Sequence, residues 1–159
     1  MTKLINACAF CFILLSVNLC HAQSATDNIA LTVNSPWTFT FNTPTLLEND
    51  QTIANAFTLT VKTKSSNCSV YASISIYSTP SGFSPSYSPL DLQLTSTTSS
   101  STSATTAAIN VTTSNALLFT QSKTTSAYTF KYNMIFRALG YDWYAGNYSY
   151  TLTFTMTQP

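Results

Sequence analysis

The stretch "NYSYTLTFTM", residues 147–156, alternates apolar side chains with serine and threonine at a period of two. Its apolar positions share one side of an extended chain: Tyr148, Tyr150, Leu152, Phe154 and Met156. A strand with this pattern buries one face and leaves the hydroxyl-bearing face in water. The stretch therefore predicts a β-strand near the end of the chain whose apolar side chains belong to a core.

The same alternation recurs along the rest of the chain, with β-branched and aromatic residues dominating. The segments are "IALTV" (29–33), "WTFTF" (37–41), "AFTLTVKT" (56–63), "VYASISIY" (70–77), "LDLQL" (90–94), "AAINV" (107–111) and "YTFKYNMIF" (128–136). Turn signals rich in Pro, Asn and Ser separate them, and no window has the spacing of an amphipathic helix. We predict an all-β protein, an antiparallel immunoglobulin-like β-sandwich of about eight short strands.

Residues 1–22 have the pattern of a secretory signal peptide. Lys3 precedes a long apolar run, and small residues flank His21 in the "CHA" that ends at Ala22. Lipidation at Cys20 is a weaker alternative, because Leu19 is bulky where such sites require a small residue. We expect cleavage after Ala22, which leaves residues 23–159 as a single β-sandwich domain.

The charges of residues 23–159 limit the kinds of partner. Five basic and five acidic side chains balance, and no basic stripe is present. This argues against binding to nucleic acid or to an anionic membrane surface. Self-association would meet little electrostatic repulsion.

Residues 23–159 also lack the groups that most catalytic sites use. The only histidine of the chain is His21, and Cys68 is the only cysteine after the leader. A catalytic triad or a zinc site therefore cannot be assembled, and the carboxylates are scattered. We expect no catalytic residue, no metal site and no cofactor; a calcium site in "ENDQ" (48–51) is a weaker interpretation than a polar turn. Cys68 is either a small buried hydrophobic residue or the site of an intermolecular bridge.

The two ends of the exported chain carry a family resemblance. The segment "AGNYSYTLTFTMT" (145–157) resembles the C-terminal strand of the class 5, alpha-type chaperone–usher pilins, and spore-coat-U-like fimbrial domains have a similar "AGxY". The segment "QSATDNIALTVNSP" (23–36) resembles the start of the same pilins. The Ser/Thr tract at 95–106 and the "YDWY" at 141–144 depart from the family. The resemblance implies a secreted protein at the cell surface, in the periplasm or at the outer membrane of a bacterium.

The resemblance also implies assembly by strand addition, between copies of this chain or with related β-sandwich subunits. Pilin sandwiches lack one strand, and the N-terminal extension of the next subunit completes them. Ile29, Leu31 and Val33 would then be the inserted side chains of a donor strand, and the apolar face of residues 148–156 would line the acceptor core. In the alternative interpretation, residues 29–33 form the first strand of a closed sandwich.

A second functional hypothesis is a monomeric module that binds carbohydrate or serves in adhesion. Tyr141, Trp143 and Tyr144 cluster in a predicted turn, where their rings could stack on sugar rings. A tryptophan beside a strand, however, often packs into the core. The tract at 95–106 is expected to be a flexible or weakly paired connection between strands.

Overall fold

The computed structural model describes residues 27–34, 37–41, 43–79, 81, 88–100, 102–141, 143 and 148–159, with the side chains of 76–78 left aside. These residues form eight strands and one short helix. The strands are β1 (Asn28–Val33), β2 (Gln51–Lys62), β3 (Cys68–Ser78), β4 (Leu90–Thr97), β5 (Ile109–Asn110), β6 (Ala116–Gln121), β7 (Tyr128–Phe136) and β8 (Ser149–Thr157), and the helix is α1 (Pro44–Glu48). The predicted signal peptide lies outside the described residues.

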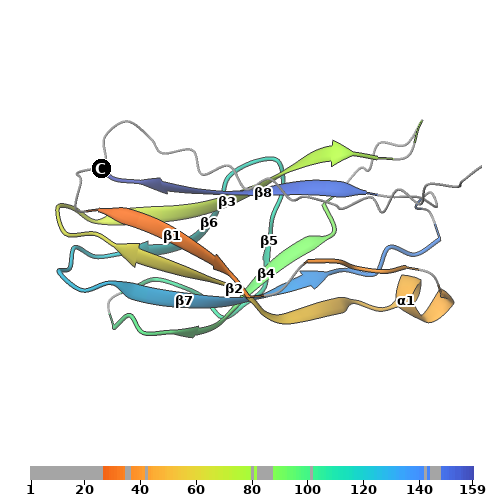
Figure 1. The fold of residues 1–159 in the computed structure, drawn as a ribbon, viewed down its shortest axis with the longest axis horizontal. Helices are drawn as coiled ribbons and strands as arrows, with labels where there is room; N and C mark the ends of the chain where they lie inside the picture. The colour runs from red at the N-terminus through yellow and green to blue at the C-terminus, as the bar shows by residue number, and fades with distance from the viewer. Residues whose placement is uncertain are drawn as a thin grey trace, which may run out of the picture.

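The strands form two antiparallel sheets that pack face to face (Figure 1). One sheet has the order β1-β2-β7-β4-β5, and the other has the order β6-β3-β8. The predicted fold class, an all-β antiparallel sandwich, is confirmed. None of the described helical residues forms a helix long and apolar enough to cross a membrane.

Aromatic rings from both sheets meet in the core. Phe57 of β2 stacks on Tyr132 of β7, with ring centroids 5.3 Å apart, and it contacts Phe154 of β8 at 5.1 Å. Phe119 of β6 stacks on Phe130 of β7 at 3.7 Å. All five rings are almost completely buried. Contacts of this kind add to the burial of apolar area and join the two sheets.

Residues 37–41, predicted to be a strand, form none in the structure, and that prediction is wrong. A β-bulge in the neighbouring β2 explains the difference: the register with β7 shifts between Ile53 and Phe57, and Asn55 has φ 49°. The backbone pairing between the N-terminal segment and β2 ends at this point. The aromatic residues of 37–41 nevertheless pack against the core, with Phe39 5.0 Å from the ring of Phe136.

Strand β6 is present although its sequence, "ALLFTQ", does not alternate. A bulge in the β3–β6 pair accounts for it. Val70 pairs with Phe119 and Tyr71 pairs with Leu117, so Leu118 is an extra residue in β6. The bulge allows the consecutive Leu118 and Phe119 both to be buried. The predicted strand at 107–111 shrinks to the two residues of β5.

The Ser/Thr tract at 95–106 leads from β4 toward β5, two strands of the same sheet, and its described residues contact both sheets. It begins within β4, and the Thr98 amide then donates to the Thr129 carbonyl at 3.0 Å. Thr102 forms an isolated antiparallel bridge with Gln121 at the end of β6. The tract therefore leaves the five-stranded sheet and covers part of the β6 edge of the other one.

Candidate interface at the first and last strands

Strand β8 is an edge strand of the three-stranded sheet. It pairs with β3 from Ser69↔Thr157 to Ser78↔Ser149, and β3 lies between it and β6. Of the predicted core residues, Leu152, Phe154 and Met156 are 2–3% exposed, and Tyr150 is half-buried against the core. Tyr148 is half-buried, 5.2 Å from the ring of Trp143.

Among the described residues, the strand order differs from that of an immunoglobulin-type sandwich on the outer side of β8. An immunoglobulin-type sandwich has strands ABED in one sheet and CFG in the other. Here β1-β2-β7-β4 follows the order A-B-E-D, and β3-β8 corresponds to C and F, with β6 added beside β3. Within the described part of the chain no strand occupies the position of G, which would be the outer edge of β8.

Strand β1, which contains the predicted donor residues, lies at the edge of the five-stranded sheet. It pairs with β2 of its own chain from Asn28↔Lys62 to Val33↔Phe57. Ile29 and Leu31 are only partly buried against the core, and Val33 is 48% exposed. Insertion of these side chains into another subunit stays a prediction.

The start of β1 and the end of β8 meet at Asp27, at the end of the sandwich opposite α1 (Figure 1). The Asp27 carboxylate is buried and accepts the Ser65 amide at 3.0 Å and 3.2 Å, one bond to each oxygen. It also accepts the Gln158 side-chain amide at 2.9 Å. One side chain thus joins β1, the β2–β3 turn and the residue that follows β8.

Burial by itself raises the pKa of Asp27, but the hydrogen bonds from Gln158 and from the backbone of Ser65 and Lys64, together with the charge of Lys123, outweigh it. The net result is a pKa below the ordinary value, so the group is ionised at neutral pH. Asp27 is not predicted as a functional residue from its sequence position, because an acidic residue before a strand is usually solvated. Its position directly before an alternating strand was the only available signal.

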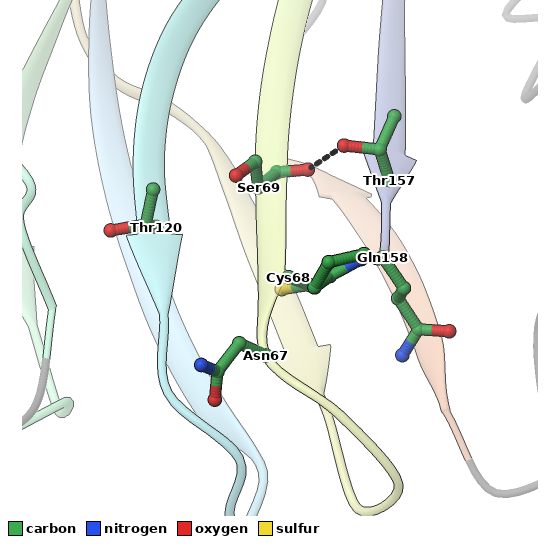
Figure 2. A pocket seen from close by; sticks show the side chains of 7 residues that line it. Asn67, Cys68, Ser69, Thr120, Thr157 and Gln158 are labelled. Carbon is green, nitrogen blue, oxygen red and sulfur yellow. Dashed lines mark hydrogen bonds between the residues drawn. The ribbon is translucent and has the colours of Figure 1, made fainter.

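A shallow recess of about 370 Å³ lies beside this corner (Figure 2). Its lining residues are Asn67, Cys68, Ser69, Thr120, Thr157, Gln158 and Pro159. Several of these residues carry hydroxyl or amide groups, and the Thr157 hydroxyl donates to the Ser69 carbonyl at 3.5 Å. The Cys68 side chain is 2% exposed, and burial raises the pKa of its thiol to about 11. A protonated, buried thiol is a poor nucleophile.

The aromatic residues proposed as a sugar-binding platform do not share one environment. Tyr141 is 66% exposed, and its hydroxyl donates to Glu48 at 2.7 Å. This hydrogen bond raises the pKa of the Tyr141 hydroxyl. Trp143 is half-buried against the core, and Tyr144 lies outside the described residues. Carbohydrate binding at this turn stays a prediction.

The acidic residues of "ENDQ" have protein partners. Glu48 accepts the Tyr141 hydroxyl, and Asp50 accepts the Ala138 amide at 2.8 Å. Among the described residues no three His, Cys, Asp or Glu side chains gather in a way that could hold a metal ion. The two acidic side chains therefore join α1 and the residue before β2 to the loop that follows β7.

Comparison of the chain with protein-family models, with curated protein sequences and with solved structures finds no match in any of the three. The geometry of the terminal strands is therefore the basis for a functional proposal.

Proposed function

We propose that this chain is a secreted, non-enzymatic structural subunit of a bacterial cell-surface filament or adhesive appendage, in which β1 of one copy pairs with the outer edge of β8 of the next. The observation that carries the proposal is the outer edge of β8 over residues 151–157, where the described residues place no strand although an immunoglobulin-type sandwich has one more strand.

An open edge of this kind favours strand addition. Along residues 151–157 of β8, the described part of the chain places no strand beside the outer edge. Such an edge is a template for an incoming extended segment, whose main chain supplies hydrogen bonds and whose alternate side chains supply specificity. The Thr-rich outer face of β8 adds no charge that would oppose a second chain.

Strand β1 has the properties of the incoming segment. Its apolar residues alternate, and they are not fully buried in their own chain. Full burial of a valine side chain stabilises by about 1.5–3 kcal/mol relative to exposure. Since Val33 is 48% exposed, transfer into a better-covered site can gain roughly half of that amount.

Pairing of β1 of one copy with β8 of the next is a head-to-tail contact, which favours a fibre. Donor and acceptor are different surfaces of the same chain, so each copy can accept one neighbour and donate to another. A head-to-tail contact whose rotation does not close produces an open filament. The balanced charge of residues 23–159 imposes little repulsion along such a filament.

Substitution of Val33 by aspartate tests the proposal. Because Val33 is 48% exposed, Val33→Asp should change the free energy of unfolding of the monomer by less than about 1 kcal/mol. An unpaired charge at a buried interface costs several kcal/mol, so polymer formation should fall by at least about a hundredfold. Sedimentation and negative-stain electron microscopy over a range of concentrations of chain 23–159 measure the polymers.

Leu117→Asp is the matched control, since Leu117 is 46% exposed and belongs to β6, which is in a different sheet from β1 and at the opposite edge of the sheet from β8. This variant should form as much polymer as the original chain at each concentration. The proposal fails if the original chain stays monomeric at high concentration, or if the two aspartate variants assemble equally well.

A further inference from the structure

Asp27 is the point where the proposed donor strand is tied to the proposed acceptor strand of the same chain. Its carboxylate immediately precedes β1, and it accepts a hydrogen bond from Gln158, the residue immediately after β8. A second pair of contacts, to the Ser65 amide, ties it to the β2–β3 turn. Release of β1 from its own sheet must break all of these bonds.

The other attachments of β1 are those of an ordinary edge strand. Among the residues that the structure describes, the six residues of β1 pair with β2 on one side only. At the far end, the Asn34 amide donates to the Ala56 carbonyl at 3.0 Å, and the Asn34 side chain donates to the Asn55 carbonyl at 2.7 Å. Four of the six β1 residues are exposed. The buried charge at Asp27 is therefore the strongest local attachment at the N-terminal end of the strand.

We propose that Asp27 is a latch that holds β1 in its own sheet and so limits the rate at which β1 is exchanged into a second copy of the chain. This inference rests on the proposed function. Opening the latch would free the start of β1, the proposed donor, from both the β2–β3 turn and the residue after β8. The donor strand would then be available for the outer edge of β8 in a second copy.

The charged surroundings keep the latch closed near neutral pH. Lys123 faces Asp27 from the β6–β7 connection, and the Lys64 backbone contributes a further hydrogen bond. The Cys68 thiol, which the carboxylate influences, stays protonated. Since the pKa of Asp27 is lowered, acid opens the latch only below the ordinary range of a carboxyl group. Competition from a second copy, and not mild acidification, is the expected trigger.

Hydrogen exchange followed by mass spectrometry tests the latch separately from assembly, at a concentration where the full chain is monomeric. Asp27→Asn keeps the shape of the side chain but removes its charge and one acceptor. Hydrogen bonds to charged groups are strong enough that exchange in residues 28–33 should rise by at least about tenfold. Exchange in β7 should stay unchanged. Gln158→Ala removes one hydrogen bond only, so exchange in residues 28–33 should rise by a smaller factor.

Asp91→Asn is the matched control. Asp91 pairs with Arg137 at 3.0 Å and accepts the Asn110 side chain at 2.8 Å, on the β4–β5 side of the same sheet. This variant removes the same charge without touching β1. The latch proposal is overturned if Asp27→Asn and Gln158→Ala both leave residues 28–33 unchanged, or if they raise exchange equally in β1 and β7.

A covalent lock separates the latch from the proposed function. Ala30 and Thr60 are directly opposed in the β1–β2 pair, at a spacing that suits a cross-strand disulfide. Ala30→Cys with Thr60→Cys, in a Cys68→Ala background, should abolish polymers when oxidised and restore them when reduced. Asp27→Asn in the unlocked chain should speed polymer formation by about tenfold.

Each pattern of results has one meaning. Polymers abolished by the lock but unaffected by Asp27→Asn would refute the latch and leave strand exchange intact. Polymers that persist in the oxidised, locked chain would refute the proposed function, while the hydrogen-exchange result would still decide whether Asp27 holds β1.

Discussion

Strands β1 and β8 are both edge strands of the described sheets, and both alternate apolar and polar side chains, yet their apolar residues are buried to different extents. Leu152, Phe154 and Met156 of β8 are 2–3% exposed. In β1, Ile29 and Leu31 are partly buried, and Val33 is 48% exposed.

The difference comes from what lies opposite each strand. The inward face of β8 meets aromatic rings of the other sheet: Phe154 lies 5.1 Å from Phe57, and Tyr150 lies 6.1 Å from Phe136. Strand β1 is the edge strand of the larger sheet, beside β2. Alternation therefore determines which side of a strand is apolar, whereas position in the sandwich determines how deeply that side is buried.

The largest expected effect is on stability, and it contrasts the two strands directly. Phe154→Ala should lower the free energy of unfolding by about 3–5 kcal/mol, because a large ring is removed from a packed core. Val33→Ala should lower it by less than about 1 kcal/mol. Urea denaturation followed by tryptophan fluorescence measures both. Equal losses in the two variants would show that β1 is as deeply packed as β8.

The next effect concerns the corner where β1 begins and β8 ends. Burial raises the pKa of the Cys68 thiol from 9.0 to about 11, which lowers its thiolate population near pH 8 by about a hundredfold. Alkylation of the native chain should therefore be at least about a hundredfold slower than alkylation of the unfolded chain. Mass spectrometry of iodoacetamide-treated samples follows the reaction.

Rapid alkylation of the native chain would mean that the corner opens readily. The same samples, run on a gel without reductant, decide between the two interpretations of Cys68. A buried hydrophobic residue gives monomers, whereas an intermolecular bridge gives dimers that a reductant dissolves.

The smallest effect concerns Tyr132, which stacks on the Phe57 ring. Phe57 is opposite Val33 in the β1–β2 register and stacks on Tyr132, whose buried hydroxyl has no hydrogen-bond partner among the described residues. Tyr132→Phe keeps the ring and removes the unsatisfied group, so the free energy of unfolding should rise by up to about 1 kcal/mol. Thermal unfolding measures the change, and a clear loss of stability would reveal a partner for the hydroxyl.

The alternating segments were predicted well because period-two patterns depend on local geometry alone. The failures have non-local causes. Residues 37–41 alternate perfectly, but the bulge at Asn55 ends the ladder they would have joined. Strand β6 does not alternate, and the bulge at Leu118 makes it a strand nonetheless.

The candidate interface shows the same division. The apolar residues of both terminal strands could be named from the pattern, but Asp27 could not, because its partners lie 38 and 131 residues away in the chain. Likewise, Tyr141 and Trp143 are two residues apart, and only the fold separates them into an exposed and a half-buried ring.

The amino-acid sequence by itself determined that this protein is built from antiparallel strands, since alternating side chains bury one face in any sheet that forms. Only the tertiary structure decided that the last strand is an edge, that the first strand is incompletely buried, and that one carboxylate joins the two. Those properties depend on strand order and on contacts between distant residues, which no local pattern encodes.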